Sequence, residues 1–327
     1  MYESRFITEF GVVLPNSLDH SKTLHLVDPE LRAVLEVFSG FDLRDDTLEG
    51  LRGLPTSEPL KSPPYQEQYV PRANGEEPLR LLVITPQKTS KPANLNPAMV
   101  YMHGGGFVMG SPEMILLSVQ KIARDTGRII VIPQYRLAPE HPFPAALDDN
   151  ILALKWTHQN AKNLHIDTSD IAIGGDSAGG GHAAILAAAI RGMDKLPVSR
   201  LLLIYPMLDD RTGAKALRDN ITGEFIWTAE NNRFGWASYL GKETDLTNGC
   251  VPARLKNLEG FPPTFIATCG LDLFMEENIR FIERLQEAGI EADIYMAEGA
   301  YHGFNVLVPE AQVSKDFHKM CVDYLKF

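Results

Sequence analysis

The chain has 327 residues, of which 44% are hydrophobic and 22% are charged, values typical of a globular protein and outside those of disordered or collagen-like chains. The net charge is −11 and no basic run is present, which excludes nucleic acid and anionic membrane surfaces as expected partners. A neutral or cationic substrate is expected instead.

Targeting signals are not predicted. The first fifteen residues contain Glu3, Arg5 and Glu9 and no unbroken apolar run, unlike a signal peptide. No apolar run reaches the ~18 residues that a membrane span needs. The three cysteines are odd in number and far apart, which favours reduced thiols over a disulfide framework. We therefore expect a cytoplasmic protein.

The first sixty residues are predicted to be helical, with no strand among them. Asp28 and Pro29 are typical of a helix start, and Gly40 is expected to end that helix. A weaker helical pattern begins at Leu48 and stops at Pro55. These helices precede every predicted strand, so we expect them to pack as a cap over a sheet that is built later in the chain.

From Tyr65 onward, strand and helix patterns alternate. Strands are predicted at 67–71, 79–85, 98–102, 128–133, 170–173, 200–205, 264–269 and 292–296, and helices at 112–126, 145–159, 183–190 and 275–288. Such alternation predicts an α/β fold with a mostly parallel central sheet flanked by helices.

A glycine-rich loop, His103-Gly-Gly-Gly-Phe107, follows the third predicted strand. Unbranched glycines let backbone N–H groups approach an oxygen that becomes negatively charged during attack on a carbonyl. A phosphate cradle is the competing interpretation, but neither Gly-Lys-Ser/Thr nor G-x-G-x-x-G is present here. The loop is therefore a candidate oxyanion hole.

The central motif is Gly175-Asp-Ser-Ala-Gly179, which fits G-x-S-x-G between a β-branched strand and an alanine-rich helix. A sharp turn in this context pushes the serine hydroxyl out over the end of the sheet. Ser177 is therefore a candidate nucleophile; a glycine-rich turn with an incidental serine is the alternative that this pattern alone leaves open. A side chain at Gly175 or Gly179 is expected to clash, because the helix starts at once and must pack closely on the strand.

Two further residues lie just past predicted strands: Asp272 and His302. Functional loops of a parallel sheet gather at the carboxyl ends of its strands, so we expect both residues on the side of Ser177. The chain order Ser177, Asp272, His302 is the α/β-hydrolase order. Their predicted roles are base for His302 and orienting acid for Asp272.

The region between strands 200–205 and 264–269 exceeds fifty residues and is rich in aromatic side chains. So long an excursion is more than a connector. Most of its aromatic residues are expected to pack the excursion against the rest of the protein, and one or two to line a pocket.

The chain is expected to divide into a cap segment at 1–60, a core at 61–206, a cap insertion at 207–262 and the rest of the core at 263–327.

Taken together, the motifs resemble the hormone-sensitive-lipase family of α/β-hydrolase esterases. The chain carries His-Gly-Gly-Gly, Tyr135-Arg-Leu-Ala-Pro-Glu, Gly-Asp-Ser-Ala-Gly-Gly and His302-Gly-Phe in the order of that family. The resemblance implies Ser177, His302 and Asp272 as the catalytic residues and a cap in two pieces.

The resemblance also implies N–H donors for the oxyanion at Gly105, Gly106 and Ala178. The sequence departs from the family around the acid, since Asp272 is followed by Leu in place of Pro. A nearby carboxylate such as Glu276 is therefore the alternative acid. His182 is expected to pack in the core, and His103 to shape its loop.

The expected function is that of a serine carboxylesterase acting on neutral small-molecule esters of short to medium chain length. No cofactor and no metal site are predicted. A ligand-binding receptor on the same scaffold, disfavoured by His302, and a dehydratase or acyl transferase are the alternatives. Whether the chain forms a homodimer stays open.

Overall fold

The computed structural model describes residues 12–13, 18, 21–86, 95–191, 193, 196–213 and 221–326. Apart from Val12 and Val13, the residues considered for a signal peptide lie outside this part of the chain. Within the described ranges, none of the helices has both the length and the apolar character needed to cross a membrane.

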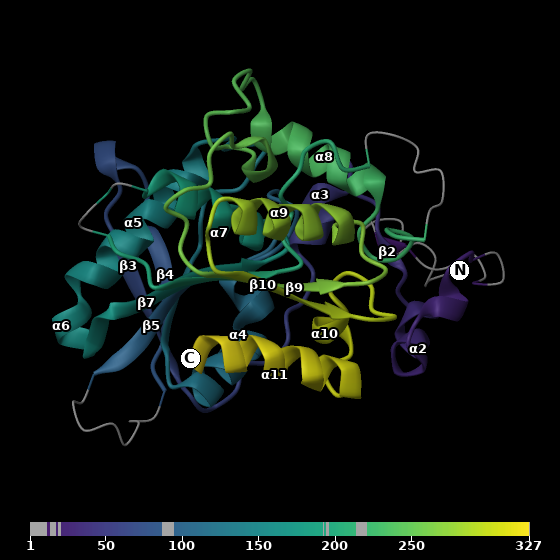
Figure 1. Cartoon of the computed structure of the whole chain (residues 1–327), viewed down its shortest axis with the longest axis horizontal. Helices are drawn as coiled ribbons and strands as arrows, with labels where there is room; N and C mark the ends of the chain where they lie inside the picture. The colour runs from purple at the N-terminus through teal and green to yellow at the C-terminus, as the bar shows by residue number, and fades with distance from the viewer. Residues whose placement is uncertain are drawn as a thin grey trace.

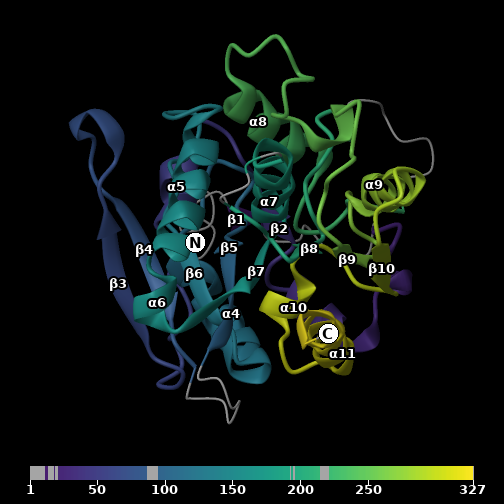
Figure 2. The ribbon, with the colours of Figure 1, turned by 60° about the vertical axis from the view of Figure 1, so that its left-hand side comes forward.

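An eight-stranded sheet forms the centre of the fold, in the spatial order β10-β9-β8-β7-β5-β6-β4-β3 (Figures 1 and 2). Neighbouring strands are parallel except at β4, which is antiparallel to both β3 and β6. The strands are β3 Tyr65–Val70, β4 Leu79–Ile84, β5 Asn96–Met102, β6 Ile129–Pro133, β7 Ile166–Asp176, β8 Arg200–Ile204, β9 Thr264–Cys269 and β10 Ala292–Ala297. The predicted α/β fold with a mostly parallel sheet is confirmed.

Helices cover both faces of this sheet, as Figure 1 shows. One face carries α4 (Pro112–Thr126), α10 (Phe304–Leu307) and α11 (Gln312–Lys326), and the other carries α5 (Ala145–Gln159), α7 (Ala178–Ala189) and α9 (Met275–Glu287). A short helix, α6 (Ala161–Leu164), follows α5. Helix α11 is not among the helices predicted from the sequence.

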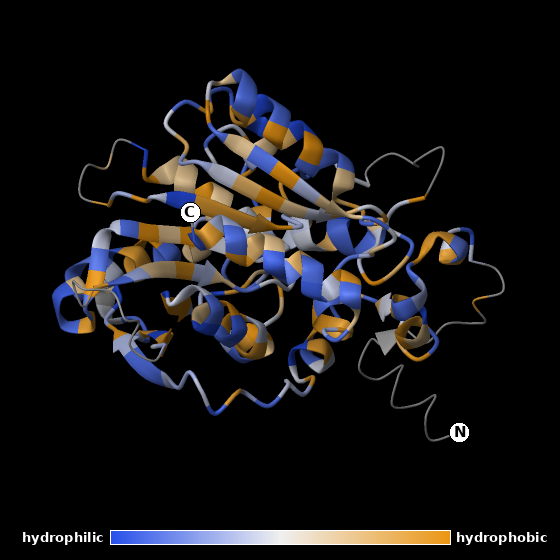
Figure 3. Ribbon diagram, turned by 60° about the horizontal axis from the view of Figure 1, so that its bottom comes forward, coloured by the Kyte–Doolittle hydropathy of each residue, from blue (hydrophilic) through white to orange (hydrophobic). Residues whose placement is uncertain are grey.

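The central strands are apolar almost without interruption because they are covered on both faces. All five residues of β6 and all six residues of β9 are buried. In Figure 3 the central strands are coloured mostly as hydrophobic, whereas hydrophobic and hydrophilic residues alternate along the helices. Local signals then set the helix bounds: α4 has Pro112 in its first turn and ends at Gly127, whose φ is 72°.

The prediction that residues 1–60 are helical and contain no strand is wrong. Gly40–Phe41 form a short strand, β2, which pairs antiparallel with β1 (Val12–Val13). Gly40 also makes a parallel bridge with Ile226, far along the chain. Such pairing depends on a distant partner, so a local hydrophobic pattern does not reveal it. The helical turns here are η2 Leu24–Leu26, η3 Pro29–Leu31, α2 Arg32–Leu35 and α3 Leu48–Arg52.

The long excursion after β8 packs against this N-terminal segment. It contains α8 (Ala229–Leu240) and a short 3-10 turn, η5 (Pro252–Arg254). Asn231 of α8 donates through Nδ2 to Phe41 O at 2.9 Å and accepts at Oδ1 from Leu43 N at 3.1 Å. Two stretches separated by almost two hundred residues are therefore joined directly, and a third apolar core forms between them and the loop after β5.

The segment that follows β6 is held by one buried carboxylate, Asp149 of α5. Its Oδ2 accepts from the backbone N–H of Arg136 at 2.9 Å and from Arg136 Nε at 3.0 Å, and its Oδ1 accepts from Arg72 Nε at 2.7 Å. The Asp149 side chain is 1% exposed. A single acidic group thus ties two arginines and two loops to α5. The pairing with Asp149 gives Arg136, the arginine of Tyr135-Arg-Leu-Ala-Pro-Glu, a structural role.

Replacing this carboxylate should destabilise the protein. In Asp149→Ala the largely buried guanidinium of Arg72 loses its carboxylate partner, and that of Arg136 keeps only its pair with the exposed Glu76. Removing one partner of a buried ion pair typically costs ~3–5 kcal/mol. Urea unfolding should show a free energy of unfolding lowered by about that amount. Glu276→Ala, which removes an exposed pair with Arg280, is the control and should unfold close to wild type. Equal midpoints for the two variants would contradict the expectation.

Candidate active site

The turn between β7 and α7 places Ser177 at the carboxyl edge of the sheet. β7 ends at Asp176 and α7 begins at Ala178, so Ser177 alone makes the turn. Its φ of 55° and ψ of −123° are values that a residue with a side chain adopts only when the surrounding structure imposes them. Ser177 N donates to Ile204 O at 2.8 Å, and Met207 N donates to Ser177 O at 3.0 Å. The predicted strand, turn and helix are confirmed.

Two glycines allow α7 to lie directly against β5. A Cβ atom at Gly179 would stand 2.1 Å from Met102 O and 2.5 Å from His103 O. A Cβ atom at Gly175 would stand 2.5 Å from the carbonyl carbon of Gly179. Cβ atoms essentially never come this close to backbone atoms, so the predicted clash at both positions is confirmed.

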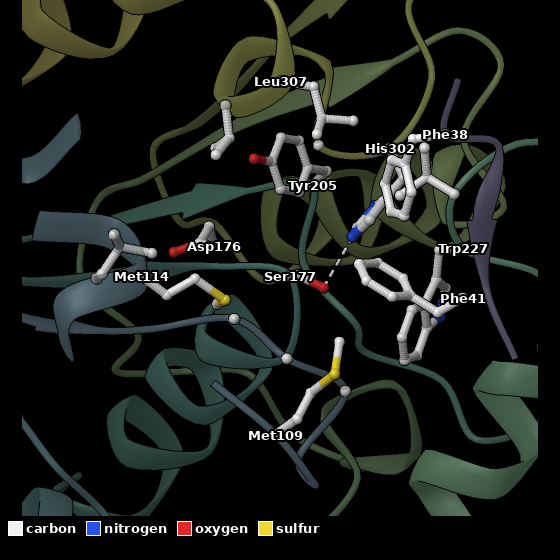
Figure 4. A pocket seen from close by; sticks show the side chains of 17 residues that line it. Phe38, Phe41, Met109, Met114, Asp176, Ser177, Tyr205, Trp227, His302 and Leu307 are labelled. Atoms are coloured by element: carbon white, nitrogen blue, oxygen red, sulfur yellow. Dashed lines mark hydrogen bonds between the residues drawn. The ribbon is translucent and has the colours of Figure 1, made fainter. Parts of the chain in front are cut away.

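A chain of hydrogen bonds connects Ser177, His302 and Asp272. His302 Nε2 lies 2.9 Å from Ser177 Oγ, and His302 Nδ1 lies 2.7 Å from Asp272 Oδ2 (Figure 4). Because the carboxylate can only accept, the imidazole proton belongs on Nδ1, which leaves Nε2 to accept the hydroxyl proton of Ser177. Asp272 is 1% exposed and also accepts from Phe274 N at 3.1 Å. The arrangement can pass a proton from Ser177 to His302.

Other carboxylates near Asp272 are engaged elsewhere. Glu276 is exposed and pairs with Arg280 one turn along α9, at 3.2 Å. Glu277 is buried, and its Oε1 accepts from the backbone N–H of Leu208 at 2.6 Å, so it ties α9 to the loop after β8. The structure therefore brings Asp272 to His302, whereas Glu276 and Glu277 make other contacts.

Three aromatic rings surround His302. Tyr205 and Phe274 contact the imidazole edge to face, with centroids 4.8 and 5.3 Å away, and Trp227 lies at 6.1 Å. Tyr205 adopts a positive φ of 34°, and its hydroxyl donates to Asn305 Oδ1 at 2.9 Å, three residues after His302. Packing thus restricts the imidazole to one orientation.

The predicted oxyanion loop lies beside Ser177. Gly105 has φ 122° and Gly106 has φ 60°, in the region that favours glycine. A Cβ atom at Gly105 would meet Met109 O at 2.0 Å, and one at Gly106 would meet the Trp227 ring at 2.2 Å. Ala178 is buried at the first position of α7, where a helix leaves its N–H groups without intrahelical partners.

His103 and His182 occupy the apolar region behind this loop. His103 Nδ1 contacts Gly104 O at 2.7 Å, and Tyr135 stacks on its ring at 4.2 Å and donates to His103 O at 2.6 Å. Burial lowers the pKa of His103 to about 4 and that of His182 to about 3. Both rings are therefore neutral at pH 7. His182 packs against Phe107 at 4.9 Å, consistent with the predicted role in the core.

A cavity of about 130 Å³ opens over Ser177. Its walls come from the N-terminal segment, the oxyanion loop, α4, the excursion after β8 and α10; they include Phe38, Phe41, Met109, Met114, Trp227 and Leu307 (Figure 4). Trp227, Trp236 and Tyr239 of the excursion are buried in the third core, and Trp227 also lines the cavity. In the described part of the chain, no group of three or more His, Cys, Asp or Glu side chains is placed to hold a metal ion.

Sequence reasoning missed several residues of this cavity. No part in the cavity is predicted from the sequence for Phe38, Asp176 or Tyr205, which all line it. One signal was available for Asp176: a carboxyl group at the end of an apolar strand, next to the predicted nucleophile, has to be buried. No local signal identifies Phe38, because its position depends on the pairing between distant segments.

The chain is similar to several known proteins. The sequence model of a family described as "alpha/beta hydrolase fold" matches residues 99–306. Carboxylesterase NlhH of Mycobacterium tuberculosis is 30% identical over 295 residues, which span 87% of this chain and 92% of NlhH. Esterase LipI of that species is 35% identical over 212 residues, which span 64% of this chain and 65% of LipI, just under two thirds. The solved structure of esterase LipW from Mycobacterium marinum matches with a TM-score of 0.82 at 29% identity, covering 93% of this chain and 96% of LipW.

The close packing of α7 on β5 predicts that position 179 tolerates no residue larger than glycine. In Gly179→Ala the new methyl group meets two backbone oxygens, which cannot move as a side chain can, so overpacking of ~1–3 kcal/mol or more is expected. Thermal and urea unfolding should both show this loss. Gly53→Ala is the matched control, because its Cβ would meet its nearest neighbour at an ordinary 3.5 Å. A Gly179→Ala protein as stable as the Gly53→Ala protein would refute the steric argument.

Proposed function

Because the chain belongs to the hormone-sensitive-lipase family of α/β-hydrolase esterases, we propose that it is a serine carboxylesterase that hydrolyses short- to medium-chain esters through an acyl-enzyme on Ser177. One observation carries the proposal: the hydrogen-bond chain from Ser177 Oγ through His302 to Asp272, with distances of 2.9 and 2.7 Å. A serine hydroxyl is a weak nucleophile by itself, and this chain supplies the base that activates it.

In the first half of the proposed reaction, Ser177 Oγ attacks the ester carbonyl while His302 Nε2 takes the hydroxyl proton. The carbonyl C=O becomes a tetrahedral oxyanion. As it collapses, the C–O bond to the alcohol breaks and His302 returns the proton to the departing oxygen. In the second half, His302 takes a proton from water, the resulting hydroxide attacks the acyl-enzyme, and Ser177 leaves with that proton. Asp272 holds Nδ1 and stabilises the imidazolium in both halves.

The proposed oxyanion hole consists of the backbone N–H groups of Gly105, Gly106 and Ala178. The first two lie in a loop whose positive φ angles only glycine tolerates well, and this loop lines the cavity beside Ser177. Ala178 opens a twelve-residue helix, so its N–H also benefits from the positive end of the helix dipole. Donors fixed in advance stabilise the developing charge without reorganisation.

The proposed substrate range follows from the cavity and its cover. We assign residues 1–60 and 207–262 to a cap, because the Gly40 and Ile226 backbones pair and both segments supply cavity walls. Apolar side chains such as Phe41, Trp227 and Leu307 suit an uncharged hydrocarbon chain. The cavity volume of about 130 Å³ is small, which favours short and medium chains over long ones.

The nucleophile is tested by Ser177→Ala. Hydrolysis of p-nitrophenyl butyrate should fall by about 10⁴-fold or more in kcat, because the remaining oxyanion donors act without a nucleophile. The wild-type protein should in addition be labelled by a phosphonate ester at Ser177, detected by mass spectrometry of the peptide. Full activity in Ser177→Ala would disprove the mechanism.

The acid is tested by comparing two isosteric substitutions. Asp272→Asn should lower kcat by about 10⁴-fold, because an amide no longer holds the imidazole in the tautomer with its proton on Nδ1. Glu276→Gln, one turn further along the chain, should retain wild-type kcat because that carboxylate faces solvent and Arg280. The reverse pattern would assign the acid to Glu276.

A further inference from the structure

The cavity over Ser177 contains a second carboxyl group, that of Asp176. It ends β7 directly before Ser177 and lies near Met114, as Figure 4 shows. Asp176 is 8% exposed. Among the described residues that line the cavity, Asp176 is the one carboxylic acid, and most of the others are apolar or glycine.

Few donors face this carboxyl group. The Tyr101 hydroxyl and the backbone of Gly104 and of Asp176 itself interact with it by hydrogen bonding, but Oδ1 is buried without a partner of ordinary geometry in the described structure. Asp272, by contrast, accepts from His302 and from Phe274 N. A buried carboxylate normally has its charge balanced by several donors or by a cation. The charge of Asp176 is therefore incompletely balanced, and its field reaches any group that enters the cavity.

The titratable groups around Asp176 belong to several elements: Tyr101 on β5, Tyr135 after β6, Tyr205 after β8, His302 before α10, and His318 and Cys321 on α11. Of these, only the histidines can carry a positive charge. Burial raises the pKa of Asp176 to about 6, against the opposing effects of His302 and Tyr101. The group is therefore negative at pH 8 and largely neutral at pH 5.

We propose that Asp176 is a specificity-determining residue that excludes esters carrying a negative charge and leaves neutral and cationic esters as substrates. A buried anion repels a second anion strongly, because the surrounding apolar side chains screen the interaction far less than water does. Neutral esters meet no such repulsion, and an ammonium group gains an attraction. The inference rests on the proposed esterase function and names the charge class of its substrates.

The test compares pairs of esters that differ in charge and hardly in shape. One pair is ethyl 3-sulfopropanoate, a permanent anion, and its neutral methyl sulfone analogue, ethyl 3-(methylsulfonyl)propanoate. A second pair carries the same groups on the alcohol part of a butanoate ester. For each pair, the ratio of kcat/KM, anionic over neutral, is measured between pH 5 and pH 8. Any loss of active enzyme with pH that is common to both esters of a pair cancels in the ratio.

In wild type, for at least one pair, this ratio should rise about tenfold or more as the pH falls from 8 to 5, because protonation removes the repelling charge. In Asp176→Asn the ratio should be high and independent of pH. Asp148→Asn removes an exposed charge in the first turn of α5 and should behave as wild type, which separates a local effect from that of the net charge of −11.

A wild-type ratio that stays constant with pH for both pairs overturns the inference, and this measurement decides even if Asp176→Asn folds poorly. A ratio that is equal in wild type and Asp176→Asn at pH 8 overturns it as well. Failure of wild type to hydrolyse either neutral ester would instead contradict the proposed esterase function. The two failures are thus distinguishable.

Discussion

The backbone of helix α7 lies in direct contact with the end of strand β5, and the rest of the site depends on this approach. At Gly179 there is room for a hydrogen atom and no more, since the oxygens of Met102 and His103 occupy the place of a Cβ. The contact forces the one-residue turn at Ser177 into its positive φ. It also brings the glycine loop that follows β5 next to the proposed nucleophile. Because Gly179 has no side chain, α7 can approach β5 closely enough to place both Ser177 and the proposed oxyanion donors.

The parallel sheet then collects the remaining groups. Asp272 and His302 follow the ends of β9 and β10, on the edge of the sheet where β7 delivers Ser177. Strand β8 lies between β7 and β9 in the sheet. Tyr205, which directly follows β8, packs on the imidazole and donates to Asn305, so it helps to fix the orientation of the base. Side chains far apart in sequence meet because parallel strands all end at one edge.

Two carboxyl groups near one histidine have different surroundings, and these surroundings suggest different roles. Asp272 bonds to His302 Nδ1 and to a backbone N–H, so its charge is used in orienting the imidazole. Asp176 faces a mostly apolar cavity with few donors, and burial raises its pKa. The cavity itself is built by segments that pair across the chain at Gly40 and Ile226. The same pairing places Phe41 and Trp227 over Ser177. Local environment, more than residue type, thus distinguishes the two acids.

The sequence by itself determined the core of the fold and two members of the hydrogen-bond chain, Ser177 and His302. Apolar runs bounded by turn residues mark the strands, and glycines around Ser177 have a steric cause that operates over a few residues, so both can be read locally. Only the tertiary structure decided which carboxylate meets His302, where residues 1–60 pair, and which aromatic rings line the cavity. Gly40 extends into a strand because Ile226 and Val12–Val13 lie beside it. Asp176 is the one acid in the cavity because the segments that form the other walls contribute no carboxylate. Contacts between distant segments decide both, and a local pattern of residues does not encode them.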